Sequence, residues 1–475
     1  MTGTGAMSGS PTDLLPELLL VLGAAVGLLL GLWTPQHRQG RVRLVALTAA
    51  LASAAAAVPA LLGDDVTVYG GTWVIDEVTG VVRLTVALST AAVLALSSRS
   101  LAGHPRETEA YVLMLLGATG AVALAAAGDM LMLVAAYLVA SVPLYALAGF
   151  VKDSRGTEAT LKYYLMGAFA GVLMLVGLTT LVLATGGSGY AGLTDRLPGA
   201  PTSLVAVGAI GLLAGVGFKA GAVPMHFWVP DVIAGTTPAM AAFITTVPKL
   251  GAVAAAFRLL EGPLAEPGVD VALVVAVIAA LSMTWGNLAA FQQTEVLRLM
   301  AYSTVSQVGY LFMAVAVAAR TDLAEPALAL YLAGYAVTNV GAFAAAAALP
   351  QARTLTDWAR AARRRPWLVG SLVVVLLGLV GTPPTAVFVG KVTVFAAAAD
   401  GSFGWLMVLA AVNTVASLFY YLRWFGPAVR MTARPAGTGP AADVLPAPAR
   451  TAYAAAVGSL LLGAGAGLWL LLVGL

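Results

Sequence analysis

Long apolar runs separated by short polar stretches make up most of the 475-residue chain. Most runs are about 20 residues long, which is the length that an α-helix needs to cross a bilayer. They are rich in Ala and Leu and lack period-two alternation, so they predict helices rather than barrel strands. We therefore predict an all-α integral membrane protein with about fourteen transmembrane helices. The predicted spans are 14–34, 43–62, 78–97, 108–127, 130–150, 160–184, 203–221, 238–260, 270–291, 299–318, 325–348, 367–398, 404–425 and 452–474.

The loops between these runs alternate in charge along the chain. Basic loops stay on the cytoplasmic side of bacterial membranes. The alternation therefore supports the span count and predicts a multi-pass protein of the plasma (inner) membrane with both termini on the outer side. The basic loops carry Arg38, Arg41 and Arg43; Arg99 and Arg106; Lys152 and Arg155; Arg298; Arg353, Arg360, Arg363, Arg364 and Arg365; and Arg430, Arg434 and Arg450. The intervening loops carry Asp64 and Asp65; Asp129; Asp195 with Arg196; Glu261, Glu266 and Asp270; Asp322 and Glu325 with Arg320; and Asp400.

Composition agrees with a membrane protein and excludes several kinds of site. Only 10% of the residues are charged, whereas a soluble domain carries about 25%. The chain has no cysteine, which excludes disulfides, thiolate catalysis and cysteine-ligated iron–sulfur clusters. A net charge of +3 without a basic stripe gives no reason to expect a nucleic-acid partner.

The distribution of lysine is the most informative chemical feature. Only five of the 25 basic residues are lysines, and Lys219, Lys249 and Lys391 lie inside apolar spans, with Lys162 at the mouth of another. Arginine is effectively always protonated, whereas a desolvated lysine can exchange its proton. A charge at a helix centre costs at least about 2.5 kcal/mol. These positions therefore predict proton transfer; the alternative is that the side chains snorkel from misplaced helix ends.

Two spans contain Gly/Pro interruptions, at residues 219–224 and 381–384. They are the seventh and twelfth spans, and paired broken helices of this kind mark transport sites at repeat interfaces. His226 follows Lys219 by seven residues, or two helical turns. Since histidine titrates near neutrality, we expect a proton relay between them through water; the alternative is a structural histidine bonded to a carbonyl. No second histidine or carboxylate cluster lies near it, so no metal site is predicted.

Polar residues on later spans could extend such a path, although helix–helix hydrogen bonding is the alternative for each. Three acidic residues near span ends, Glu17, Asp76 and Glu77, are expected at the membrane interface. The sequence has no nucleotide-binding loop, catalytic triad or paired carboxylate. The polar residues of the later spans are Tyr302, Ser303, Ser306 and Gln307; Tyr335, Thr338 and Asn339; and Asn413, Ser417, Tyr420 and Tyr421.

Several motifs, in order over nearly the whole chain, resemble one family. The chain is similar to the N-subunit family of bacterial NADH-quinone oxidoreductase (respiratory complex I), whose members are antiporter-like membrane subunits. Pro-Asp-Val at 230–232 fits the N type, and a lysine in the twelfth span argues against the M type, which carries glutamate there. The motifs are Leu15-Pro-Glu-Leu18, Glu158-Ala-Thr-Leu-Lys-Tyr-Tyr-Leu165, Phe218-Lys-Ala-Gly-Ala-Val-Pro-Met-His-Phe-Trp-Val-Pro-Asp-Val232, Pro248-Lys249, Arg298-Leu-Met-Ala-Tyr-Ser303 with Gly309-Tyr310, Asn339-Val-Gly-Ala-Phe343, and Gly381-Thr-Pro-Pro384 leading to Gly390-Lys391.

The resemblance implies fourteen helices in one membrane domain, 1–475, with two inverted five-helix units and broken helices 7 and 12. It implies a role in coupling quinone reduction to proton translocation, within a hetero-oligomer of membrane-arm subunits in the lipid bilayer. This chain would hold no cofactor, and NADH, FMN, Fe–S clusters and quinone would belong to partner subunits. The halves would be about 108–260 and about 270–425, flanked by 14–97 and 452–474. The implied proton sites are Lys219, Lys249 and Lys391, with Lys162, His226, Gln307 and Tyr302 along a connecting polar axis.

One departure from the family pattern bears on mechanism. The family carries a glutamate in the fifth helix, and here Leu138 occupies that position; no acid lies between Asp129 and Asp153. We therefore expect nothing local to stabilise a charged Lys219. Gln307 likewise replaces a commonly seen histidine. Three alternatives stay open: a subunit of a multisubunit cation/proton antiporter or hydrogenase, a divergent paralogue with altered translocation, and a structural subunit that carries no protons.

Overall fold

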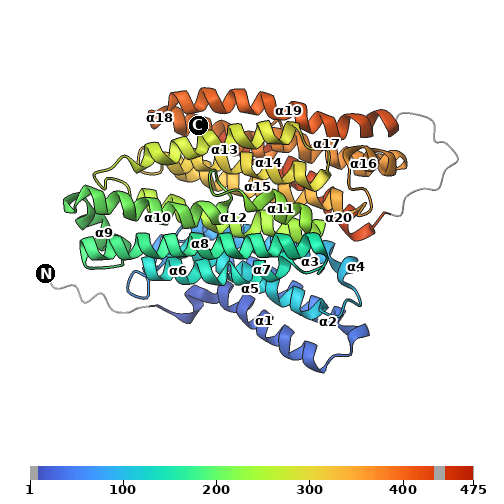
Figure 1. The fold of residues 1–475 in the computed structure, drawn as a ribbon, viewed down its shortest axis with the longest axis horizontal. Helices are drawn as coiled ribbons and strands as arrows, with labels where there is room; N and C mark the ends of the chain where they lie inside the picture. Colours follow the sequence, from blue (N-terminus) through green and yellow to red (C-terminus); the bar gives the residue numbers. More distant parts are fainter. Residues whose placement is uncertain (1–8, 433–443, 474–475) are drawn as a thin grey trace.

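A computed structural model describes residues 9–432 and 444–473, and these residues form one elongated bundle of helices (Figure 1). The long helices run roughly parallel or antiparallel to one another. The elements are α1 (Leu15–Trp33), α2 (Gly40–Leu62), β1 (Val66–Val68), β2 (Trp73–Ile75), α3 (Glu77–Leu96), α4 (Ser98–Leu101), α5 (Glu107–Ala126), α6 (Met130–Val139), α7 (Val142–Ala148), α8 (Ser154–Thr185), α9 (Tyr190–Arg196), α10 (Thr202–Ala220), α11 (Trp228–Gly235), α12 (Pro238–Glu261), α13 (Val271–Phe291), α14 (Val296–Ala316), α15 (Ala324–Ala347), α16 (Leu355–Ala361), α17 (Pro366–Val380), α18 (Ala386–Asp400), α19 (Gly404–Thr432) and α20 (Pro446–Val473), with short 3-10 turns between some of them.

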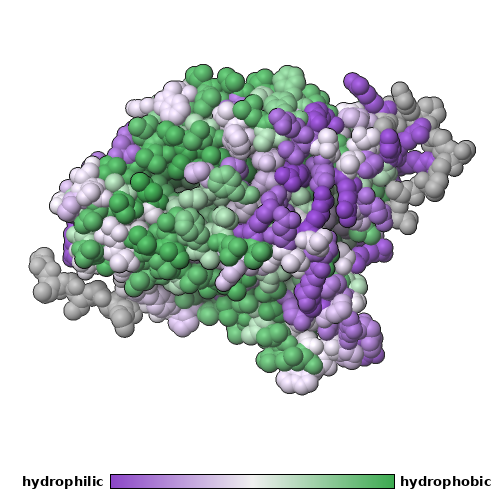
Figure 2. Space-filling view, in the orientation of Figure 1, coloured by the Kyte–Doolittle hydropathy of each residue, from purple (hydrophilic) through white to green (hydrophobic). Residues whose placement is uncertain are grey.

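The number of membrane crossings agrees with the prediction from the sequence. Among the described residues, 12 helices are long and apolar enough to cross a membrane. The interrupted pair α17–α18 and the final helix α20 bring the crossings to fourteen. Figure 2 shows hydrophobic surface over most of the face in view and hydrophilic surface concentrated towards one end of the helices. A large exposed apolar surface of this kind is suited to lipid or to partner subunits.

The core of the bundle is built around α12. Its side chains are buried on every side, and it packs against α3, α5, α10, α14 and α15. By contrast, α8 exposes bulky side chains such as Phe169 and Val172 along its outer face. The two helices are comparably apolar, but α12 is rich in alanine, which lets neighbouring backbones approach closely.

Both predicted helix interruptions are present. At the ends of α10 and α17, Gly221 and Gly381 adopt the left-handed conformation, with φ +77° and +89°. In each case the glycine amide and the next amide bond back to carbonyls of the last helical turn, which is a common way to end a helix. A proline in a cis peptide bond follows three residues later, at Pro224 and Pro384. The two helix interruptions therefore have the same local backbone structure.

A second correspondence links the loops that precede these breaks. The start of α6 forms a short antiparallel bridge with the loop after α8, and the start of α14 forms the corresponding bridge with the loop after α15. A short helix, α9 or α16, then leads into the interrupted helix. In Figure 1, α9 lies at one end of the bundle and α16 at the other, so the two units are inverted. The bridging bonds are Met130 N to Ser188 O (2.9 Å) and Tyr190 N to Gly128 O (3.0 Å), and Val296 N to Arg353 O and Leu355 N to Thr294 O (both 2.9 Å).

Candidate functional site

Lys219 lies in the last turn of α10 and is completely buried, with 0% of its surface exposed. Its Nζ donates to Ser141 Oγ at 2.5 Å and to Ala140 O at 3.3 Å. The Ala140 carbonyl is available because α6 and α7 are separate helices, and the Leu144 amide bonds to Ser141 O instead. The amine also lies 5.0 Å from the centre of the Tyr137 ring. The Lys219 amine is therefore surrounded by neutral oxygen atoms and aromatic faces.

Lys249 lies in the middle of α12 and is also completely buried. Its Nζ donates to Thr304 Oγ1 of α14 at 3.2 Å. It lies against the end of α10, because a Cβ added to Gly221 would be 3.1 Å from Lys249 Nζ. The first helix interruption therefore adjoins two buried amines, Lys219 in its last turn and Lys249 from the neighbouring helix.

Lys391 lies in the second turn of α18, just beyond the second interruption, and is 3% exposed. Its Nζ donates to Val380 O at 2.9 Å and to Thr414 Oγ1 at 3.4 Å. It also lies 3.8 Å from the centre of the Tyr310 ring. The Val380 carbonyl is free to accept because α17 ends at this residue. The broken backbone thus solvates the Lys391 amine.

Gln307 lies between Lys249 and Lys391. Its Nε2 donates to Leu379 O at 2.8 Å, one residue before the carbonyl that accepts from Lys391, and its Oε1 accepts from Tyr331 OH at 2.7 Å. Gln307 is also one helical turn beyond Thr304, the partner of Lys249. Side chains of α14 therefore extend from the middle lysine to the second helix interruption.

His226 lies in the segment between α10 and α11 and is 5% exposed. Its ring lies near the rings of Phe227 and Trp285, at centroid distances of 4.9 and 6.2 Å. Its buried Nδ1 has no hydrogen-bond partner among the described residues. A buried polar nitrogen of this kind is normally hydrogen-bonded to an ordered water or to another polar group.

Lys162 has a different environment from the three buried lysines. Its side chain is 45% exposed, and its Nζ lies 2.7 Å from both Glu158 Oε1 and Asp231 Oδ2. Asp231, in the Pro-Asp-Val motif, also pairs with Arg298 Nη1 at 3.4 Å. The Lys162 amine is therefore part of a charged cluster that joins the two halves. Tyr302 is partly buried on α14 and packs against the hydrophobic core.

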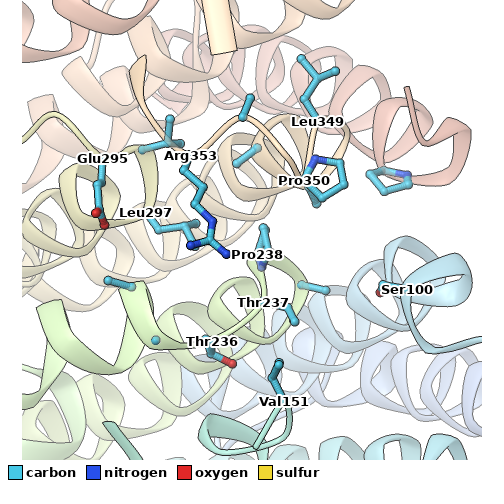
Figure 3. Close-up of a pocket in the computed structure, with 18 of the residues that line it drawn as sticks. Ser100, Val151, Thr236, Thr237, Pro238, Glu295, Leu297, Leu349, Pro350 and Arg353 are labelled. Atoms are coloured by element: carbon cyan, nitrogen blue, oxygen red, sulfur yellow. The ribbon is translucent and has the colours of Figure 1, made fainter. Parts of the chain in front are cut away.

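A cavity of about 270 Å³ lies at the basic end of the bundle (Figure 3). Figure 3 shows Arg353 extending towards Pro238, the first residue of the lysine-bearing helix α12. A second cavity of about 160 Å³ adjoins it and shares Arg155 with it. Arg155 pairs with Glu295 across the two halves at 3.4 Å. Asp153, Arg155, Glu295 and Arg353 thus add charged side chains to an otherwise mostly apolar lining near the start of α12.

Buried polar groups lie between this cavity and Lys249. Asn339 Nδ2, on α15, donates to Thr245 Oγ1 at 3.0 Å and to Thr246 Oγ1 at 2.8 Å. Its Oδ1 is buried without a hydrogen-bond partner in the described chain. Thr245 and Thr246 precede Lys249 by about one turn of α12. This stretch is therefore a polar patch in an otherwise apolar helix interface.

The sequence reasoning missed two buried ion pairs, each of which involves one of the acids expected at the membrane interface. Glu17 is buried within the protein and pairs with Arg83 of α3, Nε to Oε1, at 2.7 Å. Asp76 pairs with Arg258 of α12, Nη1 to Oδ2, at 2.7 Å. Burial acts to raise the pKa of the Asp76 carboxyl, but the Arg258 guanidinium and bonds from Thr79 outweigh burial and hold that pKa below its ordinary value. The only available signal was an arginine close to the end of an apolar span.

Comparisons with known proteins agree with this architecture. A family model described as "NADH:quinone oxidoreductase/Mrp antiporter, TM" matches residues 127–417. The chain is 51% identical to NADH-quinone oxidoreductase subunit N 1 of Streptomyces griseus, covering 98% of each chain. It is 46% identical to subunit N of a Mycobacterium species, covering 96% of this chain and 97% of the other. A chain in the structure of respiratory complex I from Thermus thermophilus with bound aureothin superposes with a TM-score of 0.81 at 32% identity, covering 95% of this chain and 98% of that one.

Proposed function

The chain belongs to the NADH:quinone oxidoreductase/Mrp antiporter family of membrane subunits, and we propose that its buried lysines carry the protons. It is a membrane-arm subunit of a proton-translocating NADH-quinone oxidoreductase and works within a hetero-oligomer. One observation carries the proposal. Lys219, Lys249 and Lys391 are buried, and their amines bond to neutral oxygen atoms, with no carboxylate of the described residues in ion-pair contact. Such an amine can gain or lose a proton without breaking an ion pair.

We place the proton inlet at the 270 Å³ cavity of the basic end. Lys249 lies eleven residues beyond Pro238, or about 16 Å deeper at 1.5 Å per residue. The Asn339 amide and the hydroxyls of Thr245 and Thr246 lie between them, and the free Asn339 Oδ1 is suited to hold a water. A proton would therefore reach Lys249 along the contact between α12 and α15.

From Lys249 the proposed path follows α14 to the second half. Thr304 contacts the Lys249 amine, and Gln307, one turn further, contacts the end of α17 beside the carbonyl bonded to Lys391. We assign Lys219 and His226 to the first half, where a proton passes between them through water, since the His226 Nδ1 is buried and unpaired among the described residues. We assign Lys162 to the contact between the two halves, which it makes through its ion pair with Asp231. We place Tyr302 at the edge of the proposed proton path.

We propose a corresponding division of the chain and its placement in the membrane. The first half is about 108–260 and the second about 270–425, with flanking helices in 14–97 and 452–474. The basic loops face the cytoplasm and both termini face outward. This chain holds no redox site of its own; NADH, FMN, Fe–S clusters and quinone belong to partner subunits. The family membership and the absence of any cluster of three metal-binding side chains among the described residues support that assignment.

Replacing the central lysine tests the proposed function. Lys249→Met keeps most of the side-chain volume and removes the exchangeable proton, so protons pumped per electron in proteoliposomes containing the whole complex should fall by at least half. Lys152→Met is the matched control, because Lys152 lies in the loop before α8, and it should pump normally. Equal amounts of assembled complex must be compared.

A structural role without proton transport is the second candidate, and Leu138 in place of the family glutamate favours it. Under that role, Lys219→Met, Lys249→Met and Lys391→Met would each leave the proton-to-electron ratio unchanged. That result for all three variants would end the proton-transfer proposal while leaving membership of the complex intact.

A further inference from the structure

We propose that tyrosine rings take the place of a carboxylate as the partners of the Lys219 amine, with Tyr137 as the principal positioning residue. The inference rests on the proposed function, since it concerns how Lys219 holds its proton. Every ion pair in the described chain that involves a lysine belongs to Lys162, so Lys219 has no acidic partner there. Its hydrogen bonds to Ser141 Oγ and Ala140 O involve neutral oxygens, so the protonated form of this buried amine still lacks a compensating negative partner.

Leu138 does not supply that partner and does not face the amine. Its side chain is 52% exposed on the outer surface of α6, whereas its neighbour Tyr137 is 2% exposed and faces inward. The centre of the Tyr137 ring lies 5.0 Å from Lys219 Nζ, and that of Tyr145 lies at 6.0 Å. Both distances fall within the range over which the face of an aromatic ring attracts a cation, about 6 Å.

Contacts with neighbouring helices hold these two rings in place. Tyr137 OH donates to Gly167 O of α8 at 3.0 Å. Tyr145 packs edge-to-face against Tyr163, with centroids 5.0 Å apart. Tyr163 in turn stacks on Trp228 at 4.3 Å, beyond the α10 interruption. The rings are therefore fixed by α8 and α11 before any charge forms on the lysine, and no reorganisation is needed when it does.

The second half contains the same arrangement independently. Lys391 Nζ lies 3.8 Å from the centre of the Tyr310 ring. Thr414 Oγ1 accepts from Lys391 and donates to Tyr310 OH at 3.2 Å. The lysine associated with each interrupted helix thus combines a hydroxyl, a backbone carbonyl and a tyrosine face. Lys249, which lies between them, bonds to Thr304.

An aromatic ring and a carboxylate differ in whether they can take up the proton of the lysine beside them. A glutamate beside a lysine can accept the proton itself, so the pair shares its titration. A ring attracts the ammonium form but takes no proton, and the amine is then the group that titrates. The titratable groups facing this site are Tyr137 and Tyr145 from α6 and α7, Tyr163 from α8, and Lys249 from α12 against Gly221.

The test separates the ring from its hydroxyl and is made on the whole complex in proteoliposomes. Tyr137→Phe loses the bond to Gly167 O but keeps the ring in its buried site, so it should stay close to the wild-type pH profile of proton pumping. Tyr137→Leu loses the ring, so the protonated amine is less favoured and the alkaline limit of pumping should move to lower pH by about one unit. Tyr137→Trp should restore the profile. Equal profiles for Tyr137→Phe and Tyr137→Leu would overturn the proposal.

Because a leucine could disturb packing, a second series keeps the shape of the side chain. Phenylalanine carrying one, two or three fluorine atoms at position 137 weakens the negative ring face stepwise. The pH limit of pumping should then shift progressively with fluorine number, and a constant limit would overturn the proposal. Lys219→Met provides the reference. If it lowers pumping while the ring series has no effect, the ring inference fails and the proton role of Lys219 stands; if it too has no effect, the proton role of Lys219 fails.

Discussion

Gly221 satisfies two separate requirements at the end of α10. Its backbone is left-handed, at φ +77°, a conformation that costs a residue with a side chain about 1–2 kcal/mol. It also leaves room for the lysine of the neighbouring helix, since an added Cβ would lie 2.9 Å from Val229 Cγ2 and 3.1 Å from Lys249 Nζ. The backbone turn and the position of the buried Lys249 amine thus depend on the same missing side chain.

Gly221→Ala should therefore destabilise the complex by at least about 1–2 kcal/mol and reduce proton pumping by displacing the Lys249 amine. The matched control is Gly217→Ala in the same helix, where an added Cβ meets nothing within 4 Å. A helical alanine is slightly favoured over glycine, so the control should be neutral or stabilising. Thermal unfolding of the purified complex measures the first effect. Identical transition temperatures for the two variants would contradict this account.

At this scale the sequence revealed some residues of the proposed site and concealed others. Lys219, Lys249 and Lys391 could be found because lysine is rare in this chain and charge is rare inside apolar spans. Tyr137 could not, because an aromatic residue is unremarkable in an apolar helix and its partner is 82 positions away in the sequence. Asn339 was noted only as one of several polar residues, since its contacts with Thr245 and Thr246 arise from the packing of α15 on α12.

Among the helices, α12 is held by an ion pair near the end opposite the cavity. Arg258 donates to both Asp76 oxygens, at 2.7 and 3.0 Å, and to Ala125 O at 2.9 Å. Asp76 also caps α3 by accepting from the Thr79 amide at 2.8 Å. One carboxylate thereby ties α3 to α12, while the guanidinium adds α5. The pair fixes the register of the helix that carries Lys249.

Asp76→Ala should destabilise the complex by about 3–5 kcal/mol, because it leaves a buried guanidinium unpaired. Asp65→Ala, an exposed acid of the preceding loop, is the control and should have little effect. The folded pKa of Asp76 lies below its ordinary value of 3.8. Its contribution is therefore complete above that value and is lost as the pH falls through the folded pKa. The stability difference between wild type and variant should persist from pH 8 to pH 5 and shrink only below about pH 4; a difference that vanished near pH 6 would exclude this role.

Helix interruptions could be predicted from the sequence, whereas helix burial could not. The Gly/Pro stretches at 219–224 and 381–384 signalled the breaks because glycine permits a left-handed cap and proline cannot continue a helix. Composition gave no comparable guide to which span lies at the centre, since lipid and protein interior are both apolar. Only the alanine-rich surface of α12, against the bulky outer face of α8, hints at the difference.

Across the whole molecule, the two inverted units place corresponding structural features at opposite ends of the helix bundle. The first unit forms its short bridge, Asp129 to Gly189, at one end of the bundle, and the second forms its own, Glu295 to Thr354, at the other. The first bridge lies in acidic loops and the second in basic ones, which agrees with the inversion that the family resemblance implied. The cavity above α12 belongs to the basic end, so the direction of uptake through the proposed inlet follows from which end faces the cytoplasm.

The absence of cysteine from the sequence makes that orientation directly measurable. Asp195→Cys on α9 and Thr356→Cys on α16 each introduce a single exposed thiol into this subunit, one at each end of the bundle. A membrane-impermeant maleimide added to intact cells should label the first variant, and label the second only after the membrane is opened. A subunit in the reverse orientation would give the opposite pattern. In that case the basic-end cavity would face outward, and the path from it through Asn339 to Lys249 would be an outlet. Lys219 with its tyrosine rings would then belong to the uptake side.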